Sequence, residues 1–356
     1  MRSKVKTAPP VPLELIRHVA HLSDVSSVKL SLVLLSRACC RDIVSILYRT
    51  INITSSNRLD LLSRTLAHEN PSLRLLPRSL RIHVGWESRY SGNVTDTSSI
   101  RDVLLLVDNL IELDLDIPSS VTLQLLRDCP PESVTFRLKY FSYVLSNYGQ
   151  PELLKFLSRQ SKLEELVQYI SPGAWYTSPL PEMAPAEPSA LPQLKSLTAG
   201  VETICYLVPG RPVSKININE CITPAITRPI ISKISQTTAF LVHLSILMSG
   251  ASANGAGVLT WLSGLSRFHE SLETLTFRIA PNTAMFDFVR NDLDSFKSAL
   301  SRFTAIRTFT ARSHSGRLDL KPRKPMVPEL DHFSWWAEVC PSLTSVSFFG
   351  NELSAA

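Results

Sequence analysis

The sequence predicts an α/β protein in which a small helical block, residues 11–53, precedes an irregular solenoid of alternating short parallel strands and helices, residues 54–356. Two observations predict this fold. A dense apolar stretch near the start has helical spacing on more than one face. Along the rest of the chain a short strand-like apolar motif recurs at intervals of 19 to 37 residues, with helix-like segments between the copies.

Composition places the chain among globular proteins, with 44% hydrophobic and 19% charged residues in a length of 356. The net charge of +6 comes from scattered basic residues, so we expect no nucleic-acid partner. No run reaches the roughly 18 apolar residues of a membrane span, so we expect no membrane partner. Residues 1–10, predicted to be a disordered basic tail, lack the apolar region of a signal peptide.

The six cysteines show no C-x-x-C spacing and no zinc-like pairing with histidine. Two of them, Cys39 and Cys40, are adjacent, which suits a mutual bridge poorly. We therefore expect buried or incidental thiols in a reducing compartment, which together with the missing signal peptide predicts a cytoplasmic or nuclear location.

The opening block reads as three helical segments followed by a strand that ends at Ile53. Pro12 suits the first turn of a helix, because no N–H is needed there. We expect the second helix to run from Leu30 to Arg41 and the third over residues 42–48. A block of about 40 residues buries too little surface to cover all of its own apolar faces. Its spare face must contact either the rest of the chain, as a cap, or another protein.

Two segments of this block resemble the F-box family. "VPLELI", residues 11–16, is similar to the family's opening L-P-x-E-[LI]-[LI], with valine in place of the usual leucine. "LSLVLLSRACCRDIVSILYRTINI", residues 30–53, is similar to the second half in many fungal F-box proteins, including the "LLYRT" exit; Cys39 stands where the family often has a large aromatic residue. The likeness extends to residue 84 and makes a fungal source an expectation.

The resemblance implies that the block binds a Skp-family adaptor and, through it, a cullin-RING ubiquitin ligase. By position, the adaptor contacts would be Val11, Pro12, Leu15, Ile16, Val33, Leu35, Ser36 and Cys39. The residues alone leave the alternative open that the block only caps the segments that follow.

The recurring motif is most complete in "LTSVSFFGNEL", residues 343–353, which matches L-x-x-L-x-L-x-x-N-x-L of leucine-rich repeats. The second apolar position of each copy falls at Leu80, Leu113, Val134, Leu166, Leu197, Ile216, Leu244, Leu275, Phe309 and Val346. One strand and one helix cannot bury their apolar sides alone, whereas stacked neighbours share a core. A doubly wound sheet is the alternative, but its near-continuous Val/Ile strands and Gly-rich turns are missing.

Two segments do not follow the repeating strand and helix pattern and are predicted to be loops. Residues 171–193 are Pro-rich and contain Trp175 and Tyr176; residues 320–336 end in Trp335 and Trp336. Aromatic residues beside prolines are weak candidates for contacts to a client protein. The alternative is that they anchor the loops to the solenoid.

The sequence contains no recognisable catalytic, metal-binding or cofactor-binding motif. The Gly-rich stretch at 250–257 lacks the Lys-[Ser/Thr] of a phosphate-binding loop, and no G-x-S-x-G or H-E-x-x-H occurs. His18 and His21 lie one helical turn apart but have no nearby third ligand. We therefore expect no catalytic residue, no metal and no cofactor.

The expected function is that of a non-catalytic substrate receptor of an SCF-type ubiquitin ligase, with the helical block on the adaptor and the repeats on a client. The alternative is a leucine-rich-repeat interaction scaffold with no role in ubiquitination.

Overall fold

A computed structural model of the chain gives a mixed α/β fold. It describes residues 11–23, 26–83, 97–129, 131–144, 151–170, 185–187, 189–248, 255–279, 293–313, 328–348 and 351–355. These residues contain twelve α-helices and a mostly parallel sheet of twelve strands that is not closed. The chain divides into two compact units, residues 1–117 with 128–136 and residues 118–127 with 137–356. The predicted tail at 1–10 lies outside the described residues.

The first unit begins with helices and continues into three parallel strands. Its elements are α1 (Leu13–Leu22), α2 (Ser26–Val33), α3 (Arg37–Leu47), β1 (Thr50–Ile53), α4 (Ser56–Arg64), a π-helical turn (Thr65–Glu69), a 3-10 turn (Pro71–Leu75), β2 (Ser79–His83), α6 (Thr97–Leu106), β3 (Glu112–Asp116) and a 3-10 turn (Pro131–Ser133). In the register of the strands, Ile51 lies opposite Leu80, and Leu80 lies opposite Leu113. The strand that ends the predicted opening block is therefore also the first strand of the sheet.

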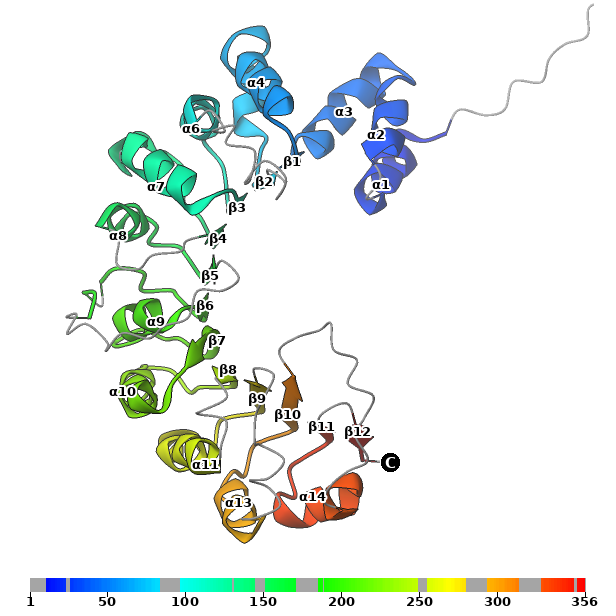
Figure 1. Ribbon diagram of the computed structural model, residues 1–356. Helices are drawn as coiled ribbons and strands as arrows, with labels where there is room; N and C mark the ends of the chain where they lie inside the picture. The colour runs from blue at the N-terminus through cyan, green and yellow to red at the C-terminus, as the bar shows by residue number, and fades with distance from the viewer. Residues whose placement is uncertain are drawn as a thin grey trace, which may run out of the picture. The chain divides into compact units, whose positions relative to one another are not determined.

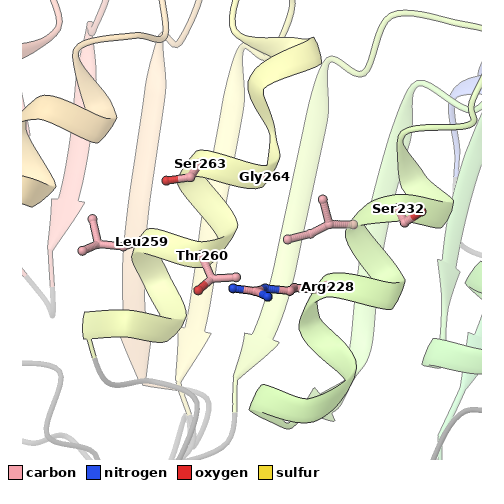
Figure 2. A pocket seen from close by; sticks show the side chains of 7 residues that line it. Arg228, Ser232, Leu259, Thr260, Ser263 and Gly264 are labelled. Atoms are coloured by element: carbon pink, nitrogen blue, oxygen red, sulfur yellow. The ribbon is translucent and has the colours of Figure 1, made fainter.

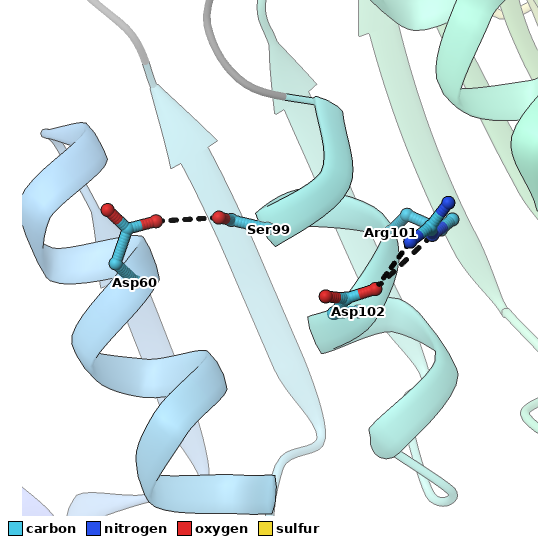
Figure 3. Close-up of polar contacts among 4 residues, drawn as sticks. All are labelled: Asp60, Ser99, Arg101 and Asp102. Carbon is cyan, nitrogen blue, oxygen red and sulfur yellow. Dashed lines mark hydrogen bonds and ion pairs between the residues drawn. The ribbon is translucent and has the colours of Figure 1, made fainter.

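Helices α4 and α6 pack against each other beside these strands (Figure 1). Both helices bury apolar residues, such as Leu59 of α4 and Ile100 of α6, at 1% and 0% exposure. At the surface the Ser99 hydroxyl donates a hydrogen bond of 2.6 Å to Asp60 Oδ1, which joins the two helices as Figure 3 shows. Exposed polar contacts of this kind contribute little to stability, so apolar contacts dominate the packing of the two helices.

The second unit repeats the alternation of strand and helix. Its elements are α7 (Ser119–Asp128, of which residues 119–127 belong here), β4 (Tyr140–Val144), α8 (Pro151–Ser158), β5 (Glu165–Tyr169), β6 (Ser196–Ala199), α9 (Val201–Leu207), β7 (Lys215–Ile222), α10 (Pro224–Ile234), β8 (His243–Met248), α11 (Gly255–Gly264), a 3-10 turn (Ser266–Phe268), β9 (Thr274–Ile279), α13 (Leu293–Leu300), β10 (Thr308–Ser313), a 3-10 turn (Pro328–Asp331), α14 (Phe333–Val339), β11 (Ser345–Phe348) and β12 (Asn351–Ser354). Within this unit the helices lie on one side of the strands (Figure 1).

The register places the predicted apolar positions of this unit directly opposite one another. Successive partners are Leu166, Leu197, Ile216, Leu244, Leu275, Phe309 and Val346. All seven side chains are 0% exposed. The motif therefore identifies one continuous row of core residues facing the helices.

One predicted strand position is wrong. Val134 lies outside any strand, and the partner of Leu166 is Phe141 of β4. The side chains of Val134, Phe136 and Leu138 are nevertheless buried. Leu138 N donates to the Gln160 side-chain oxygen at 2.8 Å, instead of to a neighbouring strand. Apolar alternation thus predicted burial correctly but not strand pairing.

The most complete copy of the motif also departs from prediction. Besides the parallel strand β11, residues 343–353 contain most of a second strand, β12, which pairs antiparallel with β11. The motif's Asn351 donates its side-chain amide to Asp331 Oδ1 at 3.0 Å. This hairpin ends the sheet.

Candidate docking surface

The opening helices expose an unusual number of large apolar side chains. Of the twelve such residues exposed in the described part of the chain, eight lie between residues 11 and 35. They are Val11, Leu15, Val19, Leu22, Val28, Leu30, Leu34 and Leu35, with exposures from 38% to 85%. A concentration of this kind on a short segment marks an interaction surface more often than a solvated one. We call these eight residues the opening apolar surface.

The helices that carry this surface have a small core of their own. Ala20 of α1 packs with Cys39, Ile43 and Ile46 of α3. The half-buried residues around that core are Leu13, Ile16, Leu32 and Val33. Because α1 presents Ile16 to this core, its neighbour Leu15 lies on the other side and remains 56% exposed. The three helices therefore bury one set of apolar side chains and leave another set exposed.

The ends of the helices differ from the predicted ones. Pro12 precedes α1 rather than occupying its first turn, and its carbonyl accepts from Leu15 N at 3.1 Å and Ile16 N at 3.3 Å. The second helix ends at Val33, because Ser36 starts a new helix. The Ser36 hydroxyl accepts a hydrogen bond of 3.1 Å from Cys39 N, the usual role of serine at a helix N-cap. The turn between α2 and α3 places Leu34 and Leu35 at the surface.

The predicted adaptor contacts consequently fall into two groups. Five are exposed: Val11, Pro12, Leu15, Leu35 and Ser36. Ile16 and Val33 are half-buried against the inner core, and Cys39 is only 4% exposed within it. Cys39 therefore supports the helices from inside. The F-box-like motif does not distinguish the exposed group from the buried one. Neighbouring residues of similar chemistry differ only in whether their side chains pack into the inner core.

The predicted client contacts are placed less favourably. Trp175 and Tyr176 lie outside the described residues. Residues 328–336, predicted as the end of a loop, form a 3-10 turn and most of α14. Trp335 is half-buried, but Trp336 is 0% exposed, so it lies in the core and cannot form part of a client surface.

A groove on the helix side of the second unit lies between α10 and α11 (Figure 2). Its volume is about 540 Å³, and the exposed Arg228 side chain extends across it toward Thr260. The Thr260 hydroxyl donates to Ala256 O at 2.6 Å within its own helix. With a single charged group and no converging set of polar ones, the groove lacks the features of a specific small-molecule site.

The same helices approach each other closely at Gly264. A Cβ atom placed there would lie 2.8 Å from Ile231 Cδ1 and 2.9 Å from Cγ2. We expect Gly264→Ala to lower the free energy of unfolding by about 1–2 kcal/mol through overpacking. Urea unfolding would measure this change, and Gly264→Ala combined with Ile231→Val should recover part of it. Ser263→Ala, at an exposed neighbouring position, serves as the control; an equal loss in that variant would contradict the steric explanation.

The titratable groups of the described residues give no sign of an activated nucleophile. Burial raises the pKa of the Cys129 thiol to about 12 and that of Cys205 to about 11. Such thiols stay protonated near neutral pH and react slowly. Burial also lowers the pKa of His243 and His269. Within the described residues no group of three or more His, Cys, Asp or Glu side chains could hold a metal ion, the exposed His18 and His21 included.

Comparison with known proteins adds no family assignment: no protein-family model matches the chain, and no curated protein matches it. None of the helices in the described ranges combines the length and apolar character needed to cross a bilayer.

Proposed function

We propose that this chain is a non-catalytic substrate receptor of an SCF-type ubiquitin ligase. In this proposal α1–α3 form an F-box that docks on a Skp-family adaptor, and the strands and helices that follow form a leucine-rich-repeat solenoid that holds a client protein. The opening apolar surface is the observation that carries the proposal, because it places eight exposed large apolar side chains in the segment whose sequence resembles the F-box.

The order of the strands supports the solenoid part of the proposal. Within each unit the strands follow one another in sequence order, without the reversal that characterises a doubly wound sheet. The helices of the second unit lie on one side of the strands, and the strands pair in register. The predicted apolar positions from Leu166 to Val346 therefore form one row, as expected for a stack of similar units that share a core.

The proposed mechanism requires no acid, base or nucleophile from this chain. Docking one face on the ligase and the other on a client raises the effective concentration of client lysines near the ubiquitin conjugate. We propose accordingly that the chain is not itself an enzyme.

The test is capture of the full chain by a purified Skp-family adaptor. Leu15→Asp with Leu35→Asp places two charges in the opening apolar surface without touching the inner core. Each substitution removes the burial of one leucine against the adaptor, worth about 1.5–3 kcal/mol. The double variant should therefore bind the adaptor at least roughly 100-fold more weakly. Isothermal titration calorimetry measures the difference, and circular dichroism verifies folding.

A matched control is available on the same unit. Leu61 and Leu75 are 51% and 56% exposed, close to the 56% and 62% of Leu15 and Leu35, yet lie outside the opening helices. Leu61→Asp with Leu75→Asp should leave adaptor binding unchanged. If the wild-type chain fails to bind any Skp-family adaptor, the ligase role is wrong and the interaction scaffold takes its place.

A further inference from the structure

The side of the second unit that faces away from its helices carries a polar row. One row of register partners across β7 to β11 consists of Asn217, Ser245, Thr276, Thr310 and Ser347. These side chains alternate with the buried apolar residues along each strand. Ser245 and Thr276 are buried, at 6% and 9% exposure, whereas Asn217, Thr310 and Ser347 are half-buried and offer hydrogen-bonding groups at the surface.

Two arginines stand side by side next to this row. Arg278 of β9 and Arg312 of β10 are direct register partners in a parallel pair. Their neighbours Phe277 and Ala311 are 0% exposed and face the helices, so both guanidinium groups lie on the opposite, polar side. Like charges directly opposite each other destabilise a sheet. An anion bound between the two groups would therefore relieve an unfavourable contact.

Arg278 is only partly satisfied by the protein. Its Nη2 donates to Asn217 Oδ1 at 2.7 Å and to Ile218 O at 2.6 Å, while its buried Nε has no hydrogen-bond partner in the described part of the chain. Desolvation first, and the charge of Arg312 next, lower the pKa of Arg278. The side chain is thus fixed in place by Asn217 yet keeps a donor unused.

No carboxylate among the described residues forms an ion pair with either arginine. On the described strands of this face the exposed charged residues are Glu165 of β5, Lys215 of β7, Arg312 itself and Glu352 of β12, which lies opposite Ser347. Glu165 lies four strands from β9, and Glu352 lies two strands from β10. Among the described residues, β9, β10 and the strands beside them therefore carry no exposed carboxylate on this face.

We propose that Arg278 and Arg312 together bind an anionic group of the client, a carboxylate or a phosphate. The inference rests on the proposed client-binding role of this unit and assigns its chemistry. Adjacent guanidinium groups present planar donor pairs that match both anions, and the half-buried Thr310 and Ser347 beside them would contact the client chain next to the anion.

Inorganic phosphate is the first probe, applied to the full chain. Thermal unfolding is compared in sodium phosphate and in sodium chloride at equal ionic strength and pH 7. A ligand that binds the folded state raises Tm, and for a weak anion site we expect phosphate to raise it by about 1–3 °C. Arg312→Gln should abolish this increment while leaving Tm in chloride equal or higher, because the like-charge contact is gone. Lys215→Gln, which removes another cation from the same face, should keep the increment.

The outcomes separate this site from adaptor docking. The Leu15→Asp/Leu35→Asp variant should keep the phosphate increment, so loss of adaptor binding and loss of the anion site are observed independently. Peptides of one sequence that carry phosphoserine, glutamate or serine at one position, compared by fluorescence anisotropy, distinguish phosphate from carboxylate; binding of the serine peptide as tight as the other two overturns the proposal. An equal phosphate increment in Arg312→Gln and wild type, or a lower Tm of that variant in chloride, also overturns it.

Discussion

Replacing Trp336 with alanine is expected to lower the free energy of unfolding of the second unit by about 3–5 kcal/mol, the range for removing a fully buried aromatic side chain. Trp336 is 0% exposed and stacks on Phe309 with ring centroids 5.4 Å apart. Its ring centroid also lies 5.8 Å from that of Phe348 and 6.1 Å from that of Phe296. Its Nε1 donates to Leu330 O at 3.0 Å, which leaves that carbonyl unpaired when the indole is removed.

The contacts of Trp336 explain why the loss should be large. Phe309 belongs to β10, Phe348 to β11 and Phe296 to α13, so one side chain joins three elements near the end of the sheet. Urea unfolding followed by far-UV circular dichroism measures the change. Trp335→Ala is the matched control, because it removes the same group from a half-buried position one residue earlier. Equal losses in the two variants would show that Trp336 does not hold these elements together.

Much of the fold follows from apolar periodicity, since a strand with one covered face must alternate. That is why Ile216 and Leu244 could be placed from their spacing alone. The same alternation misplaced Val134, because a buried extended segment that is not part of a strand has the same pattern. The antiparallel pairing of β12 with β11 was missed for a related reason: the motif specifies which side chains are buried, not the direction of the following strand.

The candidate surface was less predictable than the strands. A helix that is apolar on several sides indicates that some side chains will be exposed, but not which ones. Leu15 and Ile16 are adjacent and chemically alike, yet only Ile16 packs on the inner core. Arg278 and Arg312 lie 34 positions apart in the sequence and become neighbours only through the register of β9 and β10.

Arg211 could not have been singled out from the sequence at all, and it is expected to contribute as much as any apolar core residue. It is 0% exposed. Its guanidinium group donates to four backbone carbonyls, those of Glu187 at 2.7 Å, Ala190 at 2.7 Å, Leu207 at 2.9 Å and Pro209 at 3.2 Å. One side chain therefore joins the segment before β6 to the end of α9.

The segment that Arg211 holds is locally strained. Leu191 has φ 58°, in the left-handed region that non-glycine residues rarely adopt. Its side chain is 1% exposed, so burial keeps this conformation in place. The bond from Arg211 Nε to the preceding carbonyl, that of Ala190, restrains the same turn. Gly210, directly before Arg211, has φ 73°, which glycine accepts without strain.

We expect Arg211→Met to lower the free energy of unfolding by about 3–5 kcal/mol, because a methionine of similar length fills part of the space but leaves buried carbonyls without donors. Arg211→Lys should recover only part of the loss, since an ammonium group cannot reach four carbonyls arranged around a planar fork. Urea unfolding measures both variants. Hydrogen exchange adds a local readout: the amide of Leu194, which donates to Leu191 O at 3.2 Å, should lose protection in Arg211→Met. Wild-type stability in that variant would mean that water or rearranged backbone replaces the guanidinium group, and that Leu191 is held by its own burial alone.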